Sequence, residues 1–159
     1  MTHLDHDVLL ECWSPSSMKA FVPGPCERMG ALVRVIERVL DEVAAREGEP
    51  CDGPRMTLWA LSRWSNGDNS ALVEVRSLWA QRLGDEPALS GDHAFGWVRG
   101  AVLNLAAVAI TGSMHNLTVA CAQHALVRLG EKLDAARARI DGELALELSR
   151  LDPARRAAA

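Results

Sequence analysis

The sequence predicts an all-α fold, a compact bundle of five to six helices. Apolar residues recur at helical spacing along most of the chain, and signals that start or end helices are frequent while strand signals are almost absent. Residues 93–127 carry a single formal charge, Arg99, in a chain that is 24% charged. Because so uncharged a stretch belongs in a protein interior, we expect the bundle to form around a central apolar helical hairpin at about 93–127.

The first half of the chain predicts four helices, at about residues 3–13, 25–47, 56–64 and 69–83. The second is the best delimited, because Pro25 stands at a first helical position and Gly48 follows the last apolar turn. The third helix contains two tryptophans, Trp59 and Trp64, which are five residues apart and cannot both face inward. We expect Trp59 to face inward and Trp64 to lie at the rim.

The second half predicts the central hairpin and a long amphipathic C-terminal helix. Residues 95–110 are apolar on every side except at Arg99 and Asn104, which is typical of a central helix. After a turn at 111–113, a single helix is expected over 114–151, with charges covering one side beyond Leu126. We expect residues 1–153 to form one domain, residues 154–159 to be a frayed tail, and the last helix to offer a homodimer surface.

Composition excludes several classes of protein. A net charge of −4 and a pI near 5.7 give no electrostatic basis for nucleic-acid binding. Asp5, Asp7 and Glu11 occupy the region where a secretory signal is basic or apolar, so a cytoplasmic location is expected. Arg99 and Asn104 interrupt the apolar stretch, and we therefore expect no membrane span.

The polar residues of the predicted hairpin are the candidate site. If its two helices are antiparallel, Asn104 and Cys121 lie at comparable distances from the turn, and Arg99 and His124 fall at similar depth one or two turns further on. We expect this to place a guanidinium, an imidazole and a carboxamide in one layer, which can hold a carboxylate or phosphate. The simpler interpretation is that these groups only satisfy one another or the backbone. The residues expected to bind a ligand are Trp97, Arg99, Asn104, His115, Cys121 and His124.

A metal site has weaker support. Cys121 and His124 are three residues apart on one helix face, as zinc ligands can be, but two ligands do not make a site. The paired Glu-x-x-His pattern of di-iron bundles does not occur. We therefore expect no metal and no cofactor.

Two functional hypotheses of different class follow, with a third behind them. The first is a cytosolic binding protein that encloses a small, partly apolar molecule in a Trp-lined cavity, with arginine, asparagine and histidine at its polar end. The alternative is a helical protein–protein interaction module, such as an inhibitor, immunity protein or adaptor. A small cofactor-free or metal-assisted enzyme that uses the same histidine, cysteine and arginine layer is the third, and the sequence leaves open whether the chain is an enzyme.

Overall fold

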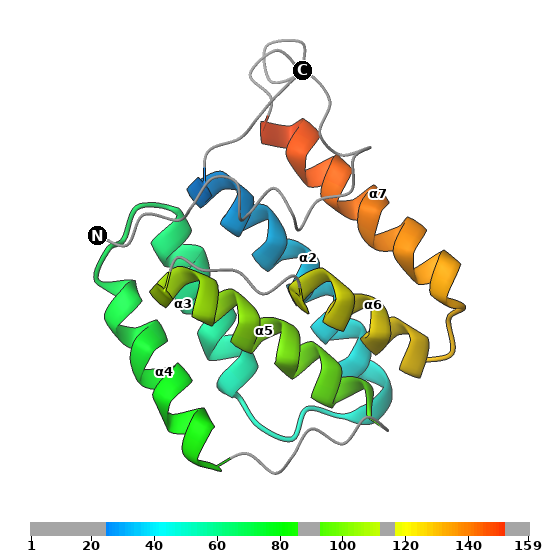
Figure 1. Ribbon diagram of the computed structural model, residues 1–159, viewed down its shortest axis with the longest axis horizontal. Coiled ribbons are helices and arrows are strands. Elements are labelled where there is room, and N and C mark those ends of the chain that lie inside the picture. Colours follow the sequence, from blue (N-terminus) through cyan, green and yellow to red (C-terminus); the bar gives the residue numbers. More distant parts are fainter. Residues whose placement is uncertain (1–24, 86–92, 112–116, 152–159) are drawn as a thin grey trace.

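Two central helices separate two outer helix pairs in a computed structural model, which describes residues 25–85, 93–111 and 117–151. The central helices are α2 (Pro25–Glu47) and α5 (Ala94–Thr111). Figure 1 shows one outer pair on each side of them, α3 (Gly53–Ser65) with α4 (Ala71–Asp85), and α6 (Leu117–Arg128) with α7 (Leu133–Leu151). Among these helices the two outer pairs do not touch each other. These described parts of the chain contain helices and no strand, which confirms the predicted all-α fold.

Helix α2 is one of the two deeply buried helices that the structure describes. It packs against α3, α5, α6 and α7, and its predicted apolar stripe is at most 1% exposed. The helix begins at Pro25 and ends one residue before Gly48, as the sequence predicts. The stripe comprises Met29, Leu32, Val33, Ile36, Val39, Leu40 and Val43.

Helix α5 is the other central element, and half of its residues are buried. Its first backbone N–H, that of Ala94, donates a hydrogen bond to the Glu47 carboxylate at the end of α2, at 3.1 Å. Since the first N–H groups of a helix have no partner within the helix, this contact ties the start of α5 to α2. Among the described helices, α5 is the one whose length and apolar composition would also suffice to cross a membrane.

The orientation expected for the two tryptophans of α3 is wrong. Trp64 is only 6% exposed and Trp59 is 59% exposed. The buried face of α3 contains Leu61, three residues before Trp64, and Thr57, seven residues before it, so Trp64 continues that face. Trp59 lies on the opposite side of the helix.

The single helix expected over 114–151 is also wrong, because the chain turns between α6 and α7. Gly130 has a φ of +105°, its N–H bonds the Val127 carbonyl, and the Glu131 N–H bonds the Leu126 carbonyl. This pair of hydrogen bonds is the Schellman motif, which ends a helix at a residue in the left-handed conformation. Arg46 of α2 also donates to the Leu129 carbonyl at 2.7 Å, which satisfies another carbonyl at this end.

Several sequence predictions fall outside the described residues. They are the helix at 3–13, the turn residues 112 and 113, and the tail at 154–159. Helix α5 nevertheless packs against α6 as the predicted hairpin requires, while α2 shares the centre of the bundle with α5.

The two glycines near α7 give a matched test of the turn. We expect Gly130→Ala to lower the free energy of unfolding by about 1–2 kcal/mol, because an L-residue is strained at positive φ. Gly142→Ala should instead raise it by about 0.5–1 kcal/mol, since Gly142 lies within α7 and its added Cβ would meet nothing within 4 Å. Urea unfolding of both variants measures the two changes, and equal effects would contradict this account of the turn.

Candidate functional site

The predicted site residues Trp97 and His124 meet across the α5–α6 contact. Their ring centroids are 4.7 Å apart and the ring planes are inclined by 28°, which is a stacked arrangement. Trp97 is near the start of α5 and His124 is near the end of α6, so the two helices run in opposite directions. Trp97 is half-buried against the core while His124 is exposed. The pair therefore presents an oriented imidazole at the surface.

Asn104 is on the same side of α5 as Trp97, two helical turns further along. Its Nδ2 donates a hydrogen bond to the Gly100 carbonyl at 2.9 Å, one turn earlier in the same helix. This bond satisfies part of the carboxamide locally, in agreement with the simpler interpretation of this residue.

Arg99 is not on the side of α5 that carries Trp97 and Asn104. Five residues separate Arg99 from Asn104, which corresponds to about 140° around an ideal helix. The two half-buried side chains thus leave α5 in different directions. The structure brings Trp97 and His124 together but gives no single layer of Arg99, Asn104 and His124. His115 lies outside the described residues.

Cys121 is buried one turn before His124 on α6, and burial raises the pKa of its thiol. A thiol with a raised pKa remains protonated near neutral pH and is a poor nucleophile and a poor metal ligand. Within the three described ranges, no group of three or more histidine, cysteine or acidic side chains could hold a metal ion.

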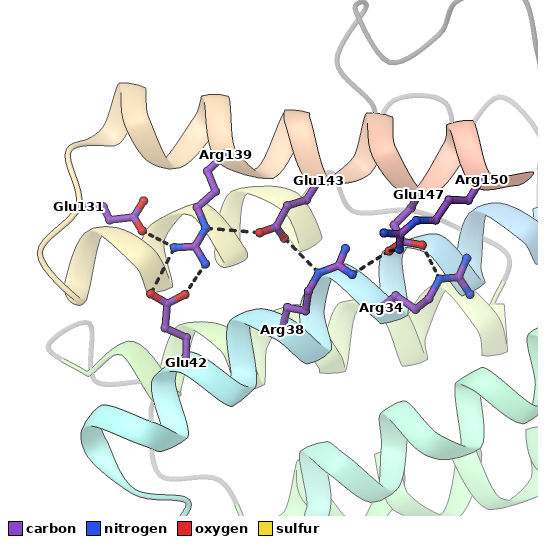
Figure 2. Close-up of polar contacts among 8 residues, drawn as sticks. All are labelled: Arg34, Arg38, Glu42, Glu131, Arg139, Glu143, Glu147 and Arg150. Carbon is purple, nitrogen blue, oxygen red and sulfur yellow. Dashed lines mark hydrogen bonds and ion pairs between the residues drawn. The ribbon is translucent and has the colours of Figure 1, made fainter. Parts of the chain in front are cut away.

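A second polar cluster, which the sequence analysis did not predict, joins α2 to α7. Its centre is Glu147, whose side chain is 2% exposed. The Glu147 carboxylate accepts hydrogen bonds from Arg34 Nε at 2.7 Å, from Arg38 Nη1 at 2.7 Å and from Arg150 Nη1 at 3.1 Å (Figure 2). A carboxylate this deeply buried needs such charged partners to remain ionised.

The cluster continues toward the α6–α7 turn. Arg139 of α7 binds Glu42 of α2 and Glu131 of the turn, and its Nε lies 3.4 Å from Glu143. Arg38 Nε, 3.6 Å from Glu143, links this group to Glu147. Figure 2 shows the eight side chains in one line between α2 and α7. We call them the ion-pair row: Arg34, Arg38, Glu42, Glu131, Arg139, Glu143, Glu147 and Arg150.

The ion-pair row favours the ionised form of two of its carboxylates, Glu147 and Glu42. Burial has the largest single effect on the pKa of Glu147 and raises it, but the hydrogen bonds and charges of Arg38 and Arg34 together lower the pKa below its ordinary value of 4.5. A hydrogen bond from Arg139 likewise lowers the pKa of Glu42. The charges are neutralised within the row, so its evident role is to hold α7 against α2.

The sequence did contain a signal for this row. Arg34, Arg38 and Glu42 recur every four residues on α2, and Arg139, Glu143 and Glu147 recur every four residues on α7. Each set occupies one side of its helix. Read in antiparallel order, the two sets place opposite charges against each other, but that order is known only once the helices are paired.

No protein-family model, no curated protein and no solved structure matches the chain. A function therefore has to be inferred from the residues that the structure places together.

The ion-pair row makes stability depend on pH in a defined direction. Carboxylates with a lowered pKa stabilise the fold above the ordinary value of 4.5, and this stability is lost as the pH falls through their folded-state pKa. We expect Glu147→Gln to lower the free energy of unfolding by about 2 kcal/mol at pH 7. The difference from the wild type should shrink as the pH falls below 4.5, measured by urea unfolding at each pH.

Arg150→Gln is the control for this prediction. Arg150 is 60% exposed and contributes one of three bonds to Glu147, so its loss should cost less than about 1 kcal/mol. A Glu147→Gln effect no larger than that of Arg150→Gln, or one that persists unchanged at pH 3, would contradict the assigned role of the carboxylate.

Proposed function

We propose that the chain is a cytoplasmic binding protein for a small, partly apolar molecule, and that the molecule binds at the edge between α5 and α6. The observation that supports this proposal is the Trp97–His124 stack at 4.7 Å. Trp97 is packed against the core and orients the imidazole, while His124 is exposed and offers a ring face and a polar ring nitrogen to a ligand. A flat apolar group with a polar end matches both features.

We assign the polar contacts with this ligand to His124 and Asn104. Seven residues separate Trp97 from Asn104 on the same side of α5, a distance of about 10 Å along the helix. A ligand of that length can stack at the Trp97–His124 pair and reach the carboxamide. Arg99 leaves α5 on another side, so it is not part of this contact set.

The enzyme alternative has less support than binding. It requires a reactive Cys121 or a catalytic His124, and burial raises the pKa of the Cys121 thiol instead of activating it. The interaction-module alternative has support of its own on the outward side of α7.

The outward side of α7 favours a second candidate role, self-association. Small residues at alternating spacings of three and four occupy this side. Leu146, which lies beside them, is 48% exposed. The spacing is that of a coiled-coil seam, and small side chains let a second helix approach closely. Charges of both signs flank the seam, so a reversed second copy of α7 can match them. The seam comprises Ala135, Ala138, Gly142, Ala145 and Ser149, with Leu146 beside it.

Native mass spectrometry of freshly purified protein tests the ligand proposal. We expect the wild-type chain to retain a small-molecule adduct and His124→Ala to lose it. The same substitution should lower the free energy of unfolding by no more than about 1 kcal/mol, because it removes only the stacking contact of an exposed ring.

His93→Ala is the matched control, since His93 is exposed at the start of α5 outside the stack. It should retain the adduct. A wild-type chain without any adduct, or an adduct that survives His124→Ala, would refute the proposed site.

Sedimentation equilibrium tests the dimer. We expect the wild-type chain to have the mass of two copies at high concentration, and Ala138→Glu to shift it to one copy, because the new charge would lie in the centre of the seam. Asp134→Asn, beside the seam, should change the mass distribution little. A wild-type chain that remains a single copy at all concentrations would exclude this role.

A further inference from the structure

The outward side of α3 carries an exposed apolar pair between two arginines. Trp59 is 59% exposed, and Met56, one helical turn before it, is 47% exposed. Arg55 and Arg63 lie four residues on either side of Trp59, on the same side of the helix. Aromatic residues, methionine and arginine are enriched in protein interfaces relative to the rest of the surface. We call these four residues the α3 patch.

The Trp59 ring is held in place before any partner arrives. The Arg63 guanidinium lies 4.5 Å from the centre of the ring, in a cation–π contact. Arg63 is itself fixed by Asp68, at 3.0 Å, and by Glu74, at 2.8 Å. Ordering of interface side chains in the free protein reduces the entropic cost of association.

At the other end of the α3 patch, Arg55 is also paired with two carboxylates. Arg55 pairs with Asp41 of α2 and with Glu49, each at 2.6 Å. Each arginine is therefore placed between two carboxylates, so that at each end of the patch the arginine and its two carboxylates together carry one net negative charge. Hydrogen bonds from Ser70 and then from Arg63 lower the pKa of Asp68, so this carboxylate is ionised at neutral pH.

We propose that the α3 patch is a docking site for a helix of a protein partner, one that carries an apolar side chain between two basic residues. Arg55 and Arg63 are eight residues apart, a distance of about 12 Å along α3. A partner helix matches both negative ends when Lys or Arg occupies positions i and i+8 and a residue such as Leu occupies i+4 against Trp59. The spacing and the signs of the charges together define this partner.

The charges of the patch exclude other occupants. Nucleic acid and anionic lipid surfaces attract basic residues, whereas both ends of the α3 patch are net negative. A second copy of the same patch would bring negative ends together. The patch lies on the side of the α2–α5 pair away from α6 and α7 (Figure 1), so this docking role goes beyond the ligand site and the α7 seam.

A labelled synthetic helical peptide with Lys, Leu and Lys at positions i, i+4 and i+8 is the probe, and its fluorescence anisotropy reports binding to the full chain. A peptide with Glu in place of both lysines is the control. We expect the lysine peptide to bind and the glutamate peptide not to bind. Trp59→Ala should weaken binding at least about tenfold, while circular dichroism should show an unchanged fold because Trp59 is exposed.

Two further sets of variants test whether the peptide binds at the α3 patch or is attracted to the acidic protein as a whole. Val73→Ala removes an exposed apolar residue of α4, 69% exposed, outside the patch and should leave binding unchanged. Asp41→Asn and Glu74→Gln should each weaken binding several-fold at low salt and less at high salt. Any of three results would overturn the proposal. The two peptides could bind with equal affinity, Trp59→Ala could leave binding unchanged, or the lysine peptide could fail to bind at concentrations up to about 1 mM.

Discussion

The burial of α2 is the constraint on which the rest of the fold depends. This helix contacts α3, α5, α6 and α7, so most of its circumference has to be apolar, and its stripe from Met29 to Val43 meets that demand. Except for Arg28, which is fully buried, none of the charged residues of α2 is among the buried ones. Arg34, Arg38 and Glu42 face α7, whereas Asp41 binds Arg55 of α3. The charges that α2 cannot bury thus fix the helices beside it.

This division gives the molecule three surfaces with different chemistry. The edge between α5 and α6 holds the Trp97–His124 stack, where an aromatic ring anchored in the core meets an exposed imidazole. The seam on the outward side of α7 contains no charged residue. The outward side of α3 instead sets Trp59 between two arginines that are each paired with carboxylates. We propose a different class of ligand for each surface, because stacking, close helix packing and charge complementarity select different partners.

Helix positions could be predicted from the sequence far better than the contacts between helices. Pro25 and Gly48 act locally, and the helix that they delimit, α2, begins and ends where expected. Apolar residues continue in helical spacing on both sides of Gly130, so the backbone hydrogen bonds are needed to reveal the turn there. The stack of Trp97 on His124 depends on how α5 is rotated against α6, which no local pattern specifies. The separation of Arg99 from Asn104, in contrast, follows from their five-residue spacing on one helix and is predictable from the sequence.

The ion-pair row selects the register of α7 along α2. The apolar face of α7, Ala136, Ile140, Leu144 and Leu148, repeats every four residues, so a shift of one turn along α2 would preserve most apolar contacts. The charges do not tolerate that shift. Displaced one way, Arg139 would meet Arg38; displaced the other way, it would meet Arg46 while Glu143 would meet Glu42. Apolar burial therefore favours the docking of α7, and like-charge repulsion selects one register among those that burial alone would allow.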